Sequence, residues 1–547
     1  MSLHSLFFLT LVLAQADAPA AADDIDRKYP LGDQLRVLAE DAASPAYYKL
    51  VTEEMLSTDL AAEWQRVETL DNAESFIEKH GGQERVMADT DLKRAWQRRV
   101  DIRNQFLEVM RAGFRRYKLE PPFDRGEKAE RAGTAAGRVT QPVADLAVVY
   151  PSPGAERNWP RFRGPDGQGG TGLSKLPVRW SESENIVWRT ALPGSGNSSP
   201  VVWADQVFLT SAGPEGADRM LHCVRTTDGQ LLWSRTIPEN HVEPKVRDKN
   251  GFASGTPVTD GERVIAFFGA AGLVAFDMQG SFLWQHTFAN FDTTHGAGAS
   301  PLLYKDSVIF IHDQNKGESI CLALDKRTGK MVWQTPRGKV MGWSTPVIVR
   351  VGDHDELLYA GGETVKGYDP NTGAELWSLD GPTREVVPAI VIGPDVVYSA
   401  SGRNGPTLAI RPGGQGDVTA THLAWRAVRG GPHVPSPILY GGCLYTVNDT
   451  GIGSCLDAKT GETIWQARIR DKFSASPIEA GGLLYFPSES GVTYVLRAGD
   501  KFEIVAENDL GSPILASPAI AAGRLLLRTQ AELVCIDEKT ERGTLAP

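Results

Sequence analysis

The stretch Ala323-Leu324-Asp325-Lys326-Arg327-Thr328-Gly329-Lys330-Met331-Val332-Trp333 carries the pattern that decides the fold, A-x-D-x-x-T-G-x-x-x-W. It reads as two β-strands joined by a tight turn. Glycine permits the positive φ that such a turn requires, and Asp and Thr side chains hold its backbone amides. The Trp supplies a large face that can pack between neighbouring units. The same turn or its Gly-to-Trp interval recurs at Gly373 with Trp377, Gly461 with Trp465, Gly229 with Trp233 and Gly280 with Trp284.

A second repeated motif gives the number of repeat units. A Ser/Thr-Pro step opens an apolar run eight times, with Val387 replacing the hydroxyl residue in the fifth copy. The prolines are Pro200, Pro257, Pro301, Pro346, Pro388, Pro437, Pro477 and Pro518. They are spaced 40 to 57 residues apart, which is the size of a four-stranded propeller blade. We therefore expect an all-β, eight-bladed β-propeller preceded by a small α-helical N-terminal region.

The two ends of the repeat region complement each other. The segment around Trp188 looks like a fourth strand without its first three, whereas the last unit, ending at Asp537, lacks a fourth. The strand near Trp188 should complete the C-terminal blade, because closure removes open sheet edges. The fourth-strand positions are Trp188, Trp233, Trp284, Trp333, Trp377, Trp425, Trp465 and the region of Ala506.

These repeats resemble the pyrroloquinoline quinone (PQQ)-like repeat β-propellers of the quinoprotein alcohol dehydrogenase-like superfamily. Over residues 158 to 537 the chain also resembles exported propellers of planctomycete-type bacteria, through Asn158-Trp159-Pro160-Arg161-Phe162-Arg163-Gly164-Pro165 and Val434-Pro435-Ser436-Pro437. The superfamily includes quinone-dependent dehydrogenases, which hold PQQ beneath a disulfide of adjacent cysteines with a calcium ion. It also includes non-enzymatic members. This chain has no adjacent cysteine pair, and no segment matches the calcium ligands or the catalytic Asp.

The whole chain divides into four parts. Residues 1–18 read as a signal peptide, 19–118 as an α-helical region, 119–157 as a linker, and 158–547 as the propeller. In the helical region, Leu92, Trp96, Val100, Leu107, Met110 and Phe114 form an apolar stripe opposite a basic face. We expect the basic face of this helix, 92–118, to be exposed to solvent or docked on the acidic remainder of the chain. The alternative is that it binds an anionic lipid or polymer.

Composition limits the functions further. The formal net charge of −11 argues against a nucleic-acid partner, and no second stretch is long enough to span a membrane. The five cysteines are far apart, and Cys443 and Cys455 could either pair as a disulfide or remain thiols on adjacent strands. Export would place the protein in the periplasm or outside the cell.

The loops that enter the innermost strands surround one mouth of a propeller's central channel, and a ligand would be met there. The candidate ligand-binding residues are Asn197, Lys249, Asn250, Phe252, His295, Trp343, Arg384, Glu385, His433 and Phe473. The alternative is structural, with aromatics plugging the channel and polar groups satisfying one another. No catalytic or metal-binding residue is assigned. The prediction is a non-enzymatic exported propeller that binds an envelope protein, a peptide or a small ligand, with a degenerate PQQ-dependent oxidoreductase as the alternative.

Overall fold

The structure is a computed structural model that describes residues 83–97 and 146–538, except 174, 242, 244–248, 289, 290, 294, 316, 403 and 404. The chain divides into two compact units, Met1–Arg138 and Val139–Pro547. The predicted signal peptide 1–18 and most of the basic helix lie outside the described residues. Over the part that is described, no helix is long and apolar enough to cross a membrane.

The first unit contains a short helical pair. Helix α7 (Gln83–Ala88) is followed by a second helix over 90–97. The Asp89 carboxylate caps this helix by accepting the amides of Asp91 and Leu92 at 2.9 and 3.1 Å. Val86, Leu92 and Ala95 form a small core, so the start of the predicted apolar stripe is buried as expected.

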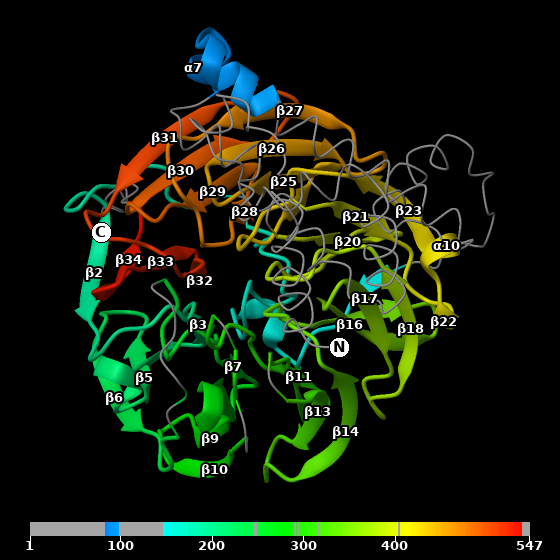
Figure 1. The fold of residues 1–547 in the computed structure, drawn as a ribbon. Helices are drawn as coiled ribbons and strands as arrows, with labels where there is room; N and C mark the ends of the chain where they lie inside the picture. Colours follow the sequence, from blue (N-terminus) through cyan, green and yellow to red (C-terminus); the bar gives the residue numbers. More distant parts are fainter. Residues whose placement is uncertain are drawn as a thin grey trace, which may run out of the picture. The chain divides into compact units, whose positions relative to one another are not determined.

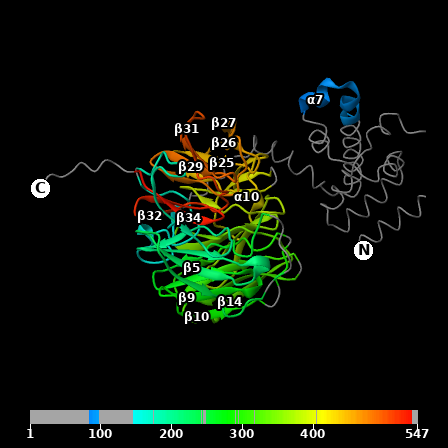
Figure 2. The same ribbon diagram turned by 90° about the vertical axis from the view of Figure 1, so that its left-hand side faces the viewer.

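The second unit is a closed ring of eight antiparallel blades (Figure 1), which Figure 2 shows from the side. Blade 1 holds β3 (Val201–Trp203), β4 (Gln206–Ser211), β5 (Met220–Arg225) and β6 (Leu231–Thr236). Blade 2 holds β7 (Val258–Thr259), β8 (Arg263–Phe267), β9 (Leu273–Asp277) and β10 (Phe282–His286). Blade 3 holds β11 (Leu302–Tyr304), β12 (Ser307–His312), β13 (Ser319–Asp325) and β14 (Met331–Gly338). Blade 4 holds β15 (Val347–Val351), β16 (His354–Gly361), β17 (Thr364–Tyr368) and β18 (Glu375–Asp380).

The other four blades complete the ring. Blade 5 holds β19 (Val391–Ile392), β20 (Val397–Ala400), β21 (Thr407–Ile410) and β23 (Leu423–Ala427). Blade 6 holds β24 (Ile438–Tyr440), β25 (Cys443–Val447), β26 (Ile452–Asp457) and β27 (Thr463–Arg468). Blade 7 holds β28 (Ile478–Ala480), β29 (Leu483–Pro487), β30 (Val492–Arg497) and β31 (Ile504–Asp509). Blade 8 holds β32 (Ala519–Ala521), β33 (Arg524–Arg528), β34 (Glu532–Ile536) and β2 (Ile186–Ala191).

The predicted closure is confirmed. Strand β2 pairs antiparallel with β34, with Trp188 opposite Cys535, so the ring is completed by hydrogen bonds between its two ends. The short 3-10 turns are η1 (Ala155–Arg157), η2 (Pro214–Gly216) and η3 (Gly269–Ala271). Within the predicted linker 119–157, the structure forms β1 (Leu146–Val148), which pairs with the end of β15.

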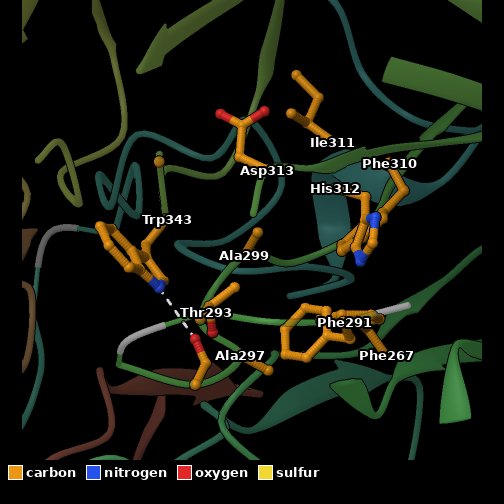
Figure 3. Close-up of a pocket in the computed structure, with 13 residues that line it drawn as sticks. Phe267, Phe291, Thr293, Ala297, Ala299, Phe310, Ile311, His312, Asp313 and Trp343 are labelled. Carbon is orange, nitrogen blue, oxygen red and sulfur yellow. Dashed lines mark hydrogen bonds between the residues drawn. The ribbon is translucent and has the colours of Figure 1, made fainter. Parts of the chain in front are cut away.

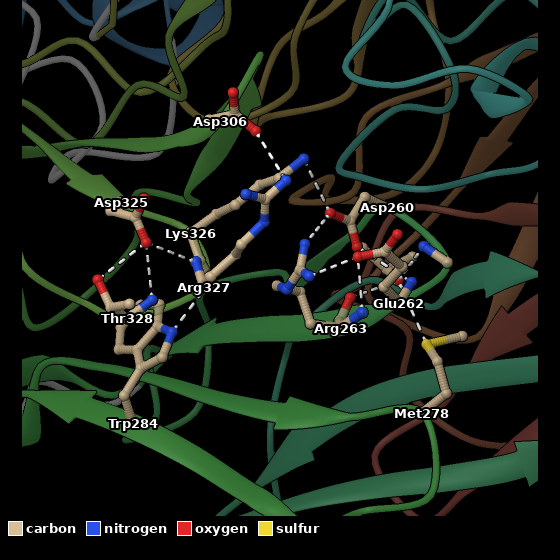
Figure 4. Close-up of polar contacts among 12 residues, drawn as sticks. Asp260, Glu262, Arg263, Met278, Trp284, Asp306, Asp325, Lys326, Arg327 and Thr328 are labelled. Atoms are coloured by element: carbon tan, nitrogen blue, oxygen red, sulfur yellow. Dashed lines mark hydrogen bonds and ion pairs between the residues drawn. The ribbon is translucent and has the colours of Figure 1, made fainter.

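The repeated turn holds neighbouring blades together, because it accepts a hydrogen bond from a tryptophan of the previous blade; we call this contact the tryptophan staple. The Asp325 carboxylate accepts the amide and hydroxyl of Thr328, both at 2.8 Å, and the indole N–H of Trp284 from the previous blade donates to the Lys326 carbonyl at 3.0 Å (Figure 4). In blade 6, the amides of Thr460 and Lys459 lower the pKa of the equivalent Asp457 carboxyl. Six tryptophans donate in this way to the next blade: Trp188, Trp233, Trp284, Trp333, Trp425 and Trp465. The turn motif is therefore architectural, as the sequence predicts.

The five cysteines are free thiols. Cys443 lies opposite Asp457 and Cys455 opposite Tyr445, so the two residues lie on paired strands but are offset in register. Burial raises the pKa of the Cys455 thiol to about 12, as expected for an unreactive core residue.

Candidate functional site

The central channel contains an open cavity of about 440 Å³. Residues at or just before the innermost strand of every blade line it, from Asn197 in blade 1 to Leu515 and Ser517 in blade 8. The loops that the sequence analysis selected therefore surround one site.

Seven of the ten candidate residues line this cavity: Asn197, Lys249, Asn250, His295, Trp343, Glu385 and His433. The other three do not. Phe252 packs 5.5 Å from the Arg219 guanidinium, Arg384 is exposed outside the cavity, and Phe473 is fully buried against Tyr494.

Glu385 lies between two histidines at the mouth. Its carboxylate oxygens are each 3.8 Å from a ring nitrogen, one from Nε2 of His295 and the other from Nε2 of His433. The His295 ring also packs against Trp343, with centroids 5.4 Å apart. The two histidines therefore converge on one carboxylate. Over the described residues, however, no group of three or more His, Cys, Asp or Glu side chains could hold a metal ion.

The rest of the mouth is tied together across blades. Lys249 Nζ lies 2.9 Å from the Glu489 carboxylate of blade 7, and the Lys249 carbonyl accepts from Asn197 Nδ2 at 3.0 Å. Asn250 Nδ2 donates to the His295 carbonyl at 2.6 Å. The rim groups thus bond one another, as the structural alternative expects, yet they leave an open cavity beneath them.

Below the rim, the Ser/Thr residues of the Ser/Thr-Pro steps form a hydroxyl ring. Its members are Ser199, Thr256, Ser300, Thr345, Ser436, Ser476 and Ser517, and all of them line the cavity. In most of the ring, the amide of one member donates to the hydroxyl oxygen of the next. The Ser199-to-Thr256, Thr256-to-Ser300, Ser436-to-Ser476, Ser476-to-Ser517 and Ser517-to-Ser199 bonds measure 2.9 to 3.1 Å. The Ser/Thr-Pro step therefore joins blades as well as starting them.

A closure segment, residues 158–171, crosses the far end of the channel. Its backbone pairs with Val202 of blade 1 and Glu479 of blade 7, and the Pro160 carbonyl accepts from Thr259 of blade 2. Gln168 accepts from the Ile392 amide of blade 5 at 2.7 Å. Phe162 from this segment lines the cavity, so the channel is a pocket with an aromatic floor.

A smaller cavity of about 10 Å³ lies beside Trp343, lined by Phe267 of blade 2, by the loop that enters blade 3 and by the end of β12 in blade 3 (Figure 3). The Trp343 indole lines both cavities and donates to the Gly296 carbonyl at 2.9 Å. His312 stacks on Phe288, with centroids 4.4 Å apart, and burial lowers its pKa to about 4. Nε2 of His312 and Oγ1 of Thr293 have no partner among the described residues, and the space between blades suits one water.

Sequence reasoning missed the hydroxyl ring and Phe162 as lining residues. The Ser/Thr-Pro step marked the start of each blade, and its eightfold recurrence on the innermost strand was itself the signal for a ring around the axis. Phe162 lies in an irregular loop without periodicity. Nothing local in the sequence indicates that this loop returns across the channel.

The described residues do not fit a quinone held with calcium. PQQ carries several carboxylates that would each need a cation in direct contact, whereas Lys249 is the one Lys or Arg among the described residues that line the cavity, and it is paired with Glu489. The five cysteines are isolated on β-strands, and among the described residues no group of three or more His, Cys, Asp or Glu side chains could hold a metal ion.

The fold and the site define a closed PQQ-like repeat propeller whose channel opens at one end. The chain belongs to the family described as outer membrane protein assembly factor BamB. The model of that family matches residues 175–346, 220–467, 361–501 and 448–544, together more than half of the chain. No curated protein sequence matches the chain.

Solved structures share the fold at low identity. The quinohemoprotein alcohol dehydrogenase of Comamonas testosteroni is 11% identical, over 69% of this chain and 80% of that one, with a TM-score of 0.52. The quinohemoprotein alcohol dehydrogenase ADHIIG of Pseudomonas putida HK5 is 13% identical, over 71% and 81%, with a TM-score of 0.50. BamB from Moraxella catarrhalis is 15% identical, over 65% and 97%, with a TM-score of 0.49. These likenesses concern the fold alone.

Proposed function

We propose that this chain is a non-enzymatic propeller exported to the cell envelope, where the channel mouth binds a protein or peptide partner. In this proposal residues 1–18 direct export and residues 19–118 form an accessory module. The observation that carries it is the convergence of seven rim residues from six of the eight blades around one open cavity of about 440 Å³. A rigid ring presents such a surface without chemistry of its own, and the family's description concerns assembly of outer membrane proteins.

Photo-crosslinking in cells of the native envelope tests the proposal. A photoreactive residue replaces exposed Arg384, which lies outside the cavity but directly precedes the lining residue Glu385, or, as the matched control, exposed Ile464 on the outer strand of blade 6. We expect a discrete adduct from position 384 that is absent at 464 and that weakens when Glu385→Gln is added. Identical adducts at both positions, or none at 384, would contradict partner binding at the mouth.

A second arm addresses the oxidoreductase alternative. The purified protein receives PQQ and calcium, and both the cofactor absorbance band and dye-linked alcohol oxidation are measured. We expect neither a bound-cofactor band nor turnover. Stoichiometric quinone binding with alcohol oxidation would replace the non-enzymatic proposal.

A further inference from the structure

Arg528 places an uncompensated positive charge beside the channel wall. It ends β33 of blade 8 and is 3% exposed. Its Nη1 donates to the carbonyl and hydroxyl oxygens of Ser198 at 3.0 and 2.6 Å, and Ser198 directly precedes the ring member Ser199. Arg528 forms no ion pair with any described acid, and burial lowers its pKa to about 9. A buried guanidinium without a counter-charge is costly, so an anion nearby would stabilise it.

The floor of the channel carries a second surplus of positive charge. Arg161 and Arg163 flank Phe162 and are buried, at 3% and 0% exposure. Both face the carboxylate of Asp166, and no other acid contributes to the pKa of either guanidinium, which burial lowers to about 10. Nε of each Arg has no partner among the described residues, and neither has Nη1 of Arg163. Two guanidiniums therefore share one carboxylate behind the aromatic floor.

The hydroxyl ring supplies unused hydrogen-bond donors. A serine or threonine hydroxyl has one O–H donor and two lone pairs. Most ring oxygens accept one interblade amide, but none of the ring hydroxyls donates to another described residue. Six of the seven members are at most 4% exposed, and all face the cavity. Their free O–H groups can turn toward a ligand that accepts hydrogen bonds.

We propose that the hydroxyl ring binds an oxyanion, a carboxylate or phosphate group, in the inner part of the channel. The ring hydroxyls donate to the anion, and the buried charges of Arg528 and of the floor arginines favour it from behind the wall. The inference deepens the proposed binding function, on which it rests, by naming the group that the channel receives. The apolar lining of Val387, Val434 and Leu515 suits an apolar residue that carries such a group at its end.

Calorimetric titration of the full chain, at constant ionic strength set with chloride, tests the inference. The probes are inorganic phosphate, N-acetyl-dileucine with its free carboxylate, and the amide of that dipeptide. We expect the dipeptide acid to bind at least about tenfold more tightly than the amide, because a charged acceptor strengthens hydrogen bonds. Binding of phosphate without the dipeptide acid would assign the site to a free oxyanion. Equal binding of acid and amide, or no binding of acid and phosphate, would overturn the inference.

Two substitutions localise the site. Thr345→Val removes a cavity-facing hydroxyl that has no hydrogen bond to any described residue, and it should weaken binding by about threefold or more. Thr364→Val, at the start of β17 and outside the cavity, is the control and should leave binding unchanged, although it removes the hydrogen bond from the Thr364 hydroxyl to the Gly361 carbonyl at 3.2 Å. Arg528→Met should abolish binding. Arg528→Lys, which keeps the charge, should retain part of it and serves if the Met variant does not fold.

The outcome separates this inference from the proposed function. Loss of the crosslinked adduct at position 384, with oxyanion binding intact, would contradict partner binding at the mouth alone. Persistence of the adduct without oxyanion binding would overturn the inference and leave the proposed function standing.

Discussion

The junction between blades 3 and 4 differs from the junction between blades 4 and 5 in how its outer tryptophan is held. Trp333 of blade 3 donates to the Pro370 carbonyl in the tight turn of blade 4 and packs on Gly373. Trp377 of blade 4 finds no such turn and donates instead to the Glu356 carboxylate of its own blade, at 2.8 Å. At this junction, a hydrogen bond to a buried carboxylate of the same blade thus replaces the tryptophan staple between blades.

Blade 5 is the reason for the exchange. Its third and fourth strands are joined by residues 411–422, which include β22 (Gly416–Asp417) and helix α10 (Thr419–His422). Strand β22 pairs in parallel with β18 and covers the outer edge of blade 4. The same blade carries Val387 at the position where the hydroxyl ring is interrupted and Glu385 at the mouth. The blade that departs most from the repeat therefore also supplies the central carboxylate of the candidate site.

Acid should weaken the neighbouring junction, between blades 2 and 3, through His312, whose ring stacks on Phe288 and Phe291 of the loop that joins these blades. The pKa of His312 in the folded chain is about 4, below the ordinary value of 6.5, so the unfolded chain takes up the proton first as pH falls. Stability from the neutral ring is complete above pH 6.5 and is lost toward pH 4, by up to about 3 kcal/mol. Urea denaturation at pH 7 and pH 4.5 should show this loss in the wild type and a smaller one in His312→Leu. Equal acid sensitivity of both proteins would contradict the assignment.

Gly373→Ala should break the regular staple. Gly373 has a φ of +73°, and an added Cβ would lie 2.3 Å from Cε3 of Trp333. Strain at positive φ and overpacking together should lower the free energy of unfolding by about 3 kcal/mol. Gly352→Ala is the matched control, since Gly352 has a φ of +60° with no atom within 4 Å, and it should cost only about 1 kcal/mol. Similar losses in both variants would mean that the contact with Trp333 adds nothing.

Replacing each tryptophan with phenylalanine compares the two junctions directly. Trp377→Phe leaves the buried Glu356 carboxylate without one donor, whereas Trp333→Phe leaves a neutral carbonyl without one. Hydrogen bonds to charged groups are worth more, so we expect losses of about 2 and about 1 kcal/mol respectively. Chemical denaturation measures both. A larger loss for Trp333→Phe would show that the regular staple is the stronger one.

Much of the ring could be predicted because its signals are local. The eight prolines, the Gly-to-Trp interval and the orphan strand near Trp188 each follow from one blade's own geometry. The rim was harder, as His433 and Phe473 show. Both precede a Ser-Pro step by three residues, yet His433 lines the cavity and Phe473 is buried. The distance in sequence from the Ser-Pro step predicts which loop a residue belongs to, but it does not predict where the side chain points. Phe473 points into the blade because burial of its aromatic ring lowers the free energy.

The long-range parts of the site could not be predicted. Phe162 reaches the channel because the closure segment forms hydrogen bonds with residues more than two hundred positions away in the sequence, such as Ile392 and Pro437. Arg528 looks in sequence like the end of an ordinary strand. Its uncompensated charge becomes evident only when its surroundings are known.

The smallest effect concerns the gap in the hydroxyl ring. Val387 lines the cavity at the position where the other blades carry a hydroxyl, and Val387→Thr is isosteric. The new hydroxyl would face the same polar space as its neighbours, so stability should change by less than about 1 kcal/mol. The neighbouring Val386→Thr buries a hydroxyl in the apolar cluster of Val347, Ile390 and Leu408 and should cost about 2 kcal/mol. If thermal denaturation showed equal losses for both, position 387 would belong to the core of blade 5, and its gap would not be a feature of the channel.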